Sequence, residues 1–333
     1  MKTKMNRKIK LALLGTSLLA VCLLSLCLGS IPMSPIAALR ALLFSKGQGT
    51  ASLILRYVRL PRLCGAVLAG VGLSLSGLLL QSLTDNAMAS PSLIGVNAGA
   101  GFFVILALAL LPLSLAAVPV FAFFGALLAT ALILALGIRM KLKKITVVLT
   151  GLAVNAVFNA GISLLSLLDG DALVYYNAFS IGSLAGVGME RLLLPALFIL
   201  LAFFLALLLS HPLTLLSLGD ATAATLGVSV KRTRALVMLA ASLASAAAVS
   251  FAGLLGFVGL MAPHIARRLF GGSFRALLCP TLLIGALLVA LSDLLGRTIL
   301  APTELPVGIF MALLGAPFFL VLLLKGGEGH AEA

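Results

Sequence analysis

Residues 62–82 read RLCGAVLAGVGLSLSGLLLQS, and this stretch decides the kind of fold. After its first arginine the run contains no charged residue, and its polar residues are serines and one glutamine. A helix needs about 20 predominantly apolar residues to cross the hydrocarbon core of a bilayer. The stretch therefore predicts a membrane-spanning helix rather than a segment of a soluble core.

Nine further runs of similar character lie outward from this one in both directions. Hydrophobic residues make up 62% of the 333 residues and the mean hydropathy is +1.25, more apolar surface than a soluble domain can bury. We predict an all-α polytopic membrane protein that forms a single domain over residues 1–333. The eighth run is short and glycine-rich, which favours a half-span or re-entrant segment. The ten runs are residues 9–28, 62–82, 93–111, 118–137, 146–168, 192–209, 234–253, 256–266, 277–296 and 306–324.

The net charge of +14 fits a membrane topology better than nucleic-acid binding. With the N-terminus inside, sixteen of the 23 lysines and arginines fall in cytoplasmic segments, as the positive-inside rule requires. This predicts ten spans with both termini in the cytoplasm. The basic residues 1–10 before an apolar run resemble a signal peptide, but no Ala-x-Ala cleavage site follows, so we expect an uncleaved first helix.

Three basic residues gather on the opposite, outer side in residues 56–62, RYVRLPR. Arginines suit bidentate pairing with carboxylates, so one interpretation is a docking patch for an acidic outer partner. The other is anchoring to lipid phosphates. The residues alone do not choose between the two.

The chain lacks the motifs that would supply its own energy or chemistry. No phosphate-binding loop of the GxxxxGK[ST] type is present, and no cysteine–histidine cluster suggests a metal site. Among the nine acidic residues only Asp293 is expected inside a span, whereas ion-coupled carriers usually place ionisable groups at mid-membrane. A carrier working alone is therefore the weaker alternative, and a non-transporting membrane scaffold is a third.

One cytoplasmic loop, residues 211–233, has the features of a docking element. Residues 218–231 predict a short helix with Asp220 near its start, where a carboxylate favours the helix dipole, and Gly227 where a helix would stop. Such a helix could receive a soluble subunit, or it could be an ordinary connector. Separately, residues 74–79 (SLSGLL) echo residues 250–255 (SFAGLL), a weak indication of an inverted repeat.

Several stretches carry a recognisable pattern, and the most specific is residues 253–267, GLLGFVGLMAPHIAR. The others are residues 59–62 (RLPR), 76–81 (SGLLLQ), 91–100 (PSLIGVNAGA), 218–231 (LGDATAATLGVSVK), 293–297 (DLLGR) and 304–317 (ELPVGIFMALLGAP). Together, and in this order, they resemble the FecCD family, the permease subunits of type II ABC importers for iron–siderophore, haem and vitamin B12 uptake.

The resemblance implies the type II permease fold with ten helices and an inverted repeat, in a bacterial cytoplasmic membrane. It also implies a permease dimer, with itself or a paralogue, two ATPase subunits inside that use ATP and magnesium, and a substrate-binding protein outside. The chain itself would bind no cofactor and no nucleic acid and would not be an enzyme. The cargo would be a ferric siderophore moved by alternating access, with cobalamin or haem as the alternative.

The resemblance also assigns residues. The binding protein would dock on Arg59, Arg62 and Arg297, the last placed after the ninth helix. ATPase coupling maps to Gly219, Asp220, Ala221, Leu226 and Gly227. An inner gate maps to Asn86, Met88, Lys144, Ile145 and Thr146, although Asn86-Ala-Met88 departs from the family's usual Asn-Pro-Leu. Gly256, Gly259, Pro263 and His264 form a structural motif, in which His264 is expected to make hydrogen bonds in a Pro-His turn rather than to bind metal.

Overall fold

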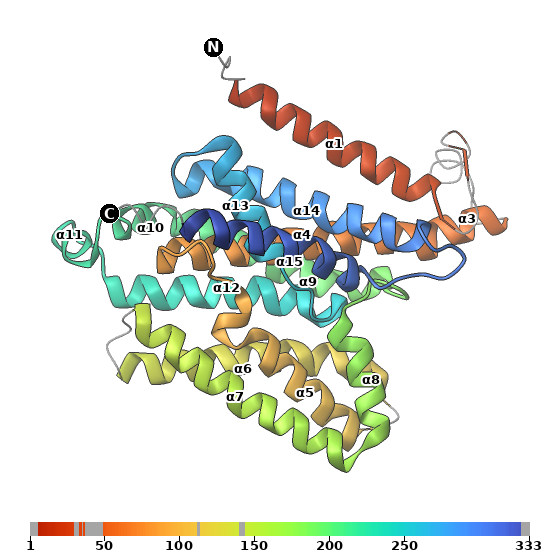
Figure 1. Ribbon diagram of the computed structural model, residues 1–333, viewed down its shortest axis with the longest axis horizontal. Helices are drawn as coiled ribbons and strands as arrows, with labels where there is room; N and C mark the ends of the chain where they lie inside the picture. The colour runs from red at the N-terminus through yellow and green to blue at the C-terminus, as the bar shows by residue number, and fades with distance from the viewer. Residues whose placement is uncertain are drawn as a thin grey trace.

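The computed structural model describes residues 6–29, 33–34, 36, 49–111, 114–139 and 144–327, and within these ranges every regular element is a helix (Figure 1). The long helices are α1 (Arg7–Cys27), α4 (Leu60–Thr84), α5 (Val96–Leu110), α6 (Val118–Arg139), α7 (Lys144–Leu168), α8 (Gly170–Ile181), α9 (Leu193–Leu208), α12 (Val230–Ala252), α13 (Val258–Phe270), α14 (Phe274–Thr298) and α15 (Val307–Gly327). The short ones are α3 (Thr50–Ile54), α10 (Ser210–Leu216), α11 (Asp220–Thr225), the π-helix η1 (Leu55–Arg59), and the 3₁₀ turns η2 (Pro91–Ile94), η3 (Leu115–Ala117) and η4 (Met189–Arg191).

Each of the ten predicted apolar runs falls largely on one long helix. Seven helices in the described residues are long and apolar enough to cross a bilayer: Arg7–Cys27, Thr50–Thr84, Leu115–Gly137, Val148–Leu168, Met189–Leu208, Val230–Ala252 and Phe274–Thr298. Val96–Leu110 and Val307–Leu322 are shorter apolar helices, and α13 has only 13 residues. The polytopic all-helical class is confirmed, whereas the number of ten spans stays a prediction.

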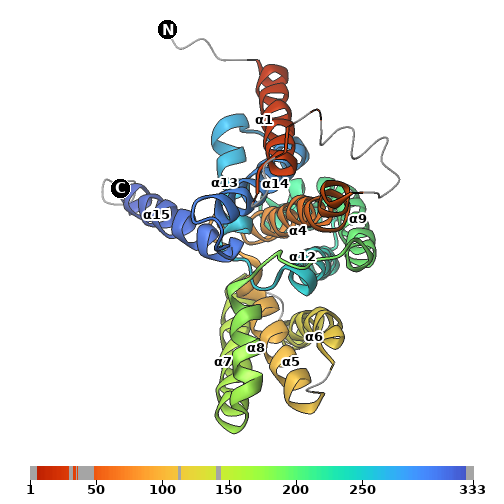
Figure 2. The same cartoon turned by 90° about the vertical axis from the view of Figure 1, so that its right-hand side faces the viewer.

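The core of the molecule is built around α4, which packs against α12, α13 and α14. In the apolar 18-residue stretch of the Thr50–Thr84 span 78% of the residues are buried, whereas in that of α1 only 11% are. Helix α4 is therefore central and α1 is peripheral. Helices α5, α6, α7 and α8 pack together as a second layer, seen below α12 in Figure 1 and from the side in Figure 2.

Glycines let α4 approach its neighbours closely. A Cβ added at Gly77 would collide with the carbonyl of Gly259 on α13, and one at Gly70 would collide with the carbonyl of Gly285 on α14. In lipid, helices associate through such small faces because burying apolar side chains gives no advantage over contact with lipid tails. Gly70, Gly77 and Gly259 therefore serve the close packing of α4 on α13 and α14.

The two stretches that echo each other in sequence do not share a conformation. Residues 74–79 lie inside α4, whereas α12 ends at Ala252 and Gly253 turns the chain with φ of +73°. The similarity therefore does not mark equivalent backbone positions, and the inverted repeat has no support from it.

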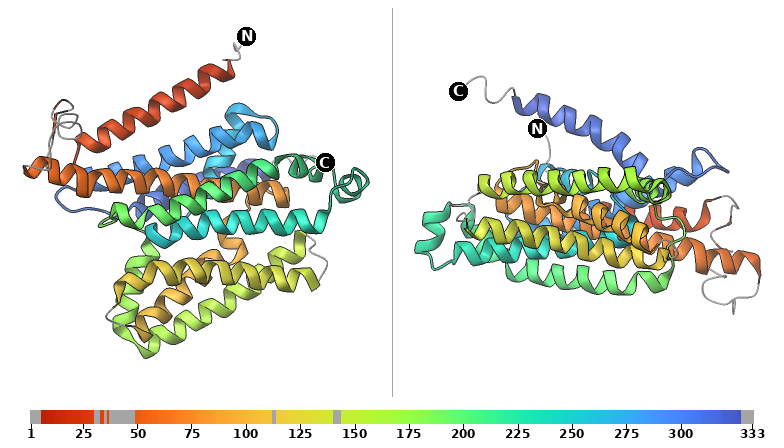
Figure 3. Two further views of the ribbon diagram at one scale, coloured as in Figure 1. Left: turned by 180° about the vertical axis from the view of Figure 1, so that it is seen from behind. Right: turned by 90° about the horizontal axis from the view of Figure 1, so that it is seen from below.

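The two ends of the bundle carry different elements. Helices α10 and α11 lie at the same end as the start of α1 and the end of α15, and α3 and η1 lie at the opposite end (Figures 1 and 3). We call the first the α11 end. The second we call the arginine end, after Arg59, Arg62 and Arg297.

Candidate functional site

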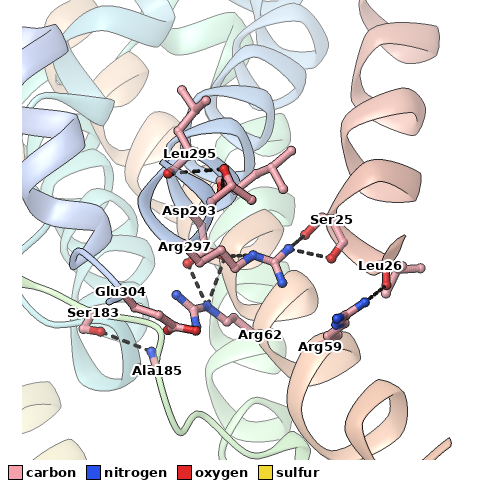
Figure 4. Close-up of polar contacts among 12 residues, drawn as sticks. Ser25, Leu26, Arg59, Arg62, Ser183, Ala185, Asp293, Leu295, Arg297 and Glu304 are labelled. Carbon is pink, nitrogen blue, oxygen red and sulfur yellow. Dashed lines mark hydrogen bonds and ion pairs between the residues drawn. The ribbon is translucent and has the colours of Figure 1, made fainter. Parts of the chain in front are cut away.

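At the arginine end, a buried ion pair joins α4 to α14. The Arg62 guanidinium donates through Nε to both carboxylate oxygens of Asp293, at 2.9 and 3.1 Å, and through Nη1 to Glu304 at 2.6 Å (Figure 4). The Asp293 carboxylate also lies 3.7 Å from Nε of Arg297. The negative charge of one buried carboxylate thus lies beside two buried guanidinium groups. Glu304 lies at the exposed rim of this cluster.

The other two arginines hold the carboxyl end of α1. Arg59 donates through Nη1 to the carbonyls of Leu26 and Cys27 at 2.7 and 3.0 Å, and Arg297 donates through Nη2 to the Ser25 carbonyl at 2.5 Å and to the Ser25 hydroxyl. The last carbonyls of a helix lack intrahelical partners and carry partial negative charge. Two guanidiniums from separate helices therefore fix this end of α1 to the core (Figure 4).

This geometry corrects the expected exposure of the arginines. Arg59, Arg62 and Arg297 are only 3%, 6% and 5% exposed, so neither an open docking patch nor contact with lipid phosphates fits them as placed. Arg297 is in the last turn of α14, not after it. The sequence showed charges of one sign, but the carbonyl and carboxylate partners come from α1 and α14, which are distant in the chain.

At the α11 end, an ion pair fixes α11 to α12. Arg234 donates through Nη2 to both carboxylate oxygens of Asp220, at 2.8 and 2.9 Å. The arginine is buried at 6% exposure, while the Asp220 side chain is about half exposed at 52%. Because α12 packs on α4, α6 and α9, this pair connects α11 to the core.

The predicted short helix is present but shorter than residues 218–231. It spans Asp220–Thr225, with Asp220 as its first residue as expected. Gly219 and Gly227 have φ of +103° and +84°, values that favour glycine, and they bracket the helix. Ala221 on the helix and Leu226 directly after it are both exposed. The preceding helix α10 was not foreseen, because Ser210, His211 and Pro212 interrupt the apolar run of α9 and residues 211–233 were interpreted as a loop.

Near the α11 end, the segment after α4 is held by local bonds. Asp85 has φ of +54°, the Asn86 carboxamide accepts from the backbone N–H of Met88 at 2.8 Å, and Asn86 is exposed. Asn86 lines a cavity of about 430 Å³ with Gln81 and Arg267. For the other predicted gate residues, Lys144, Ile145 and Thr146 begin α7, and their side chains lie outside the described residues.

A polar bridge closes one wall of that cavity. The Arg267 guanidinium donates to Oε1 of Gln81 at 2.5 Å, and the Gln81 amide donates to the carbonyl of Gly259 at 3.2 Å. The end of α4 is thereby joined to both ends of α13. Neither Gln81 nor Arg267 was predicted as a site residue, although both stand at the apolar boundary of their runs.

The Pro263-His264 pair lies inside α13, which continues to Phe270, so the expected turn at this point was wrong. Instead, the His264 ring meets the Phe318 ring of α15 edge-on, with centroids 5.6 Å apart. Gly259 of the same motif contacts α4, whereas Gly256 has open space around its Cα. Among the described residues there is no group of three or more His, Cys, Asp or Glu side chains that could hold a metal ion.

A groove between α5, α7 and α8 was missed by the sequence reasoning. Its volume is about 340 Å³, and its polar residues are Ser92, Asn97, Asn155, Asn159 and Tyr176. The Asn155 amide donates to the Ser92 carbonyl at 2.9 Å, and its Oδ1 is buried without a hydrogen-bond partner. The sequence feature that could have indicated this groove is the pair Asn155 and Asn159, which lie one helical turn apart in a largely apolar run.

Comparison with known proteins defines the class. Residues 17–325 match the model of the FecCD transport family. The chain is 37% identical to the iron(3+)-hydroxamate import system permease protein FhuG of Bacillus subtilis, over 98% of this chain and 99% of that protein. It is 36% identical to the hemin transport system permease protein HmuU of Yersinia pestis, over 81% and 83% of the two chains.

The fold is that of an ABC transporter permease. A solved structure described as an inward-facing conformation of a metal-chelate type ABC transporter superposes with a TM-score of 0.83, at 32% identity, over 96% of this chain and 100% of that one. The protein is thus a polytopic membrane permease. It belongs to the FecCD transport family.

Proposed function

We propose that this chain is the membrane subunit of an ABC importer that moves a ferric siderophore chelate into the cytoplasm by alternating access. Support for the cargo comes from relatives named for iron(3+)-hydroxamate and, at 36% identity over 96% of this chain, for Fe(3+)-citrate import. The catalytic step, ATP hydrolysis with magnesium, belongs to a pair of separate ATPase subunits.

The observation that carries this proposal is the Asp220–Arg234 pair. It ties an exposed six-residue helix to α12 in the core, which is what a transporter driven by a soluble motor requires. A surface helix held only by its loops would absorb the motion of a partner instead of passing it on. We therefore propose that Gly219, Asp220, Ala221, Leu226 and Gly227 form the contact with the ATPase.

The proposed topology follows from this assignment. The α11 end faces the cytoplasm together with both termini, and the arginine end faces outward. Ten helices then span or enter the membrane, with α13 as a half-span, and the repeat of the fold is inverted. A second permease copy or a paralogue completes the pathway, and Asn86, Met88 and the start of α7 form the inner gate.

Docking of an outer substrate-binding protein is proposed at the arginine end, in an indirect form. The buried guanidiniums of Arg59, Arg62 and Arg297 support the outer surface by holding α1, α4 and α14 together. Direct pairing with acidic residues of a partner would require the carboxyl end of α1 to leave Arg59 and Arg297.

Three alternatives remain distinct from this proposal: another cargo, an ion-coupled carrier and a membrane scaffold. The hemin relative favours haem as the second candidate cargo, with cobalamin behind it. An ion-coupled carrier is disfavoured because Asp293, the buried acid in the described residues, is already paired with Arg62 and lies beside Arg297. A carboxylate whose negative charge is already paired with guanidinium groups is poorly suited to exchange a proton or bind sodium. A membrane scaffold that moves nothing would be recognised by the absence of any uptake.

The cargo test is uptake into liposomes that contain the chain with its ATPase and binding protein. ATP-dependent uptake of radiolabelled ferric siderophore, haem and cobalamin would be measured side by side. The proposal expects accumulation of the ferric siderophore above the other two. Accumulation of haem or cobalamin alone would show that this compound, and not a ferric siderophore, is the cargo. Uptake of none of the three by an assembled complex would overturn the importer assignment.

A further inference from the structure

Two amide side chains lie near the middle of a helix long and apolar enough to span the membrane. Asn155 is half-buried and Asn159 is exposed, both within the Val148–Leu168 span of α7. An amide that meets hydrocarbon without a hydrogen-bond partner is strongly unfavourable. We therefore expect this stripe of α7 to face a polar environment rather than lipid.

The groove beside these amides is polar but neutral. Asn97 of α5 and Tyr176 of α8 complete it with Ser92, and none of its described lining residues carries a formal charge. Burial raises the pKa of the Tyr176 phenol, which keeps its hydroxyl protonated. The Asn97 and Asn159 carboxamides each offer two donors and an acceptor, whereas Asn155 already donates to the Ser92 carbonyl and its Oδ1 is buried. The groove can thus make hydrogen bonds of both senses, but it cannot neutralise a charged ligand.

The groove also borders the start of α13. Ser92 and Asn97 are shared with a second cavity of about 40 Å³, which Gly256, Phe257 and Gly259 at the start of α13 line from the other side. A ligand in the groove therefore contacts the α5–α8 layer close to its junction with α13.

We propose that this amide groove, defined by Ser92, Asn97, Asn155, Asn159 and Tyr176, contacts the cargo in transit and selects a chelate without net charge, a ferric trihydroxamate. The inference rests on the proposed function and narrows its substrate class. Three hydroxamate groups offset the charge of Fe³⁺, and their carbonyl and amide periphery matches neutral donors and acceptors. Ferric citrate and ferric tris-catecholate are anionic, and a groove without cations leaves their charge uncompensated.

Weak binding is what a transport pathway needs. A single neutral hydrogen bond contributes little net binding free energy, so a few of them orient a cargo without retaining it. A groove of about 340 Å³ covers one face of a chelate without enclosing it, which leaves the cargo free to move on.

The test uses the complete transporter in liposomes, with ATPase and binding protein, and the neutral ferric trihydroxamate as probe. Asn159→Leu is the first variant, since the exposed side chain can change without disturbing packing, and Asn155→Leu/Asn159→Leu is the second. Asn177→Leu is the matched control, because Asn177 is exposed on α8 and does not line the groove. Chromatography and basal ATPase activity check that every variant is assembled.

Asn159→Leu should lower the initial uptake rate about three- to tenfold, the double variant further, and Asn177→Leu should leave it unchanged. Equilibrium binding to the permease–ATPase complex without binding protein gives a second readout. There the trihydroxamate should bind more tightly than ferric citrate or ferric tris-catecholate, and Asn159→Leu should weaken it.

Normal uptake and binding in both leucine variants, with an active wild type, would overturn the groove assignment while the importer function stands. If an anionic chelate bound as tightly as the trihydroxamate or more tightly, the proposed preference for a chelate without net charge would be wrong. A wild type that transports no ferric chelate would overturn the proposed function itself, and the inference with it.

Discussion

The Arg234 guanidinium of α12 binds both carboxylate oxygens of Asp220, the first residue of α11, at 2.8 and 2.9 Å. The pair joins an exposed helix of six residues to α12, in whose apolar 18-residue stretch 72% of the residues are buried. It is the direct polar connection between the surface proposed for the ATPase and the core around α4.

Breaking this pair should uncouple ATP hydrolysis from transport. In Arg234→Ala the ATPase can still bind α11, but its movement is no longer passed to α12, so we expect uptake to fall at least about tenfold while ATP hydrolysis persists. Uptake and hydrolysis would be measured on the same liposomes. Arg232→Ala, at an exposed arginine on the same helix, is the control and should behave as wild type. Parallel loss of uptake and hydrolysis in Arg234→Ala would show that the pair serves assembly instead.

Removing the Asp293 carboxylate should destabilise the protein. Asp293→Ala leaves the guanidiniums of Arg62 and Arg297 buried without their shared counter-charge, at a cost of about 3–5 kcal/mol. The midpoint of thermal unfolding in detergent measures the effect. Glu304→Gln, at the exposed rim of the same cluster, should cost less than about 1 kcal/mol. A Tm for Asp293→Ala equal to that of the wild type would contradict the buried ion pair.

The carboxyl end of α1 should loosen when its arginines are removed. Cys27 is buried beside Leu55, and Arg59 donates to the Cys27 carbonyl, so Arg59→Ala/Arg297→Ala should expose the thiol and raise its rate of maleimide labelling several-fold. The assay uses a chain in which the other three cysteines are replaced. Arg191→Ala, on the exposed turn η4, is the control. An unchanged labelling rate would mean that apolar packing alone holds α1.

Charge reversal at the arginine end separates a docking patch from a structural cluster. If Arg59 and Arg62 act from within the protein, Arg59→Glu/Arg62→Glu should lower both the Tm and the affinity for the binding protein. A variant that loses binding-protein affinity but keeps the wild-type Tm would restore the exposed docking interpretation.

Filling the contact between α4 and α13 should also be costly. A Cβ at Gly77 meets the backbone carbonyl of Gly259, which cannot move aside as a flexible side chain would, so Gly77→Ala should destabilise the protein by about 1–3 kcal/mol. Gly15→Ala on α1, where nothing lies within 4 Å, should be close to neutral. Equal Tm values for the two variants would contradict the close approach of these helices.

The sequence predicts the helices well and their partners poorly. Apolar runs such as residues 62–82 and 277–296 are set by the thickness of the bilayer, which is a local and one-dimensional constraint. The end of α11 at Gly227 is also set locally, and it was foreseen, whereas Gly219 was not predicted as a helix boundary. Helix α10 was missed because Ser210, His211 and Pro212 end the apolar run of α9, and such a polar stretch with a proline is typical of a loop.

What the sequence could not show is which groups meet across the bundle. Arg62 finds Asp293 and Glu304, and Arg297 finds Ser25, over more than 200 positions of chain. Without knowledge of these partners, the arginines are interpreted from the sequence as an exposed patch. The amides of Asn155 and Asn159 were likewise passed over, because their environment depends on where α5 and α8 lie.

The most direct test of the central claim concerns the source of energy. Liposomes with the permease, ATPase and binding protein would be loaded with ATP and magnesium or with a non-hydrolysable analogue. A third set would carry no nucleotide and an imposed proton or sodium gradient. Radiolabelled ferric siderophore would be offered outside. The account predicts accumulation with hydrolysable ATP alone. Accumulation driven by an ion gradient without ATP, and its loss in Asp293→Asn, would contradict it.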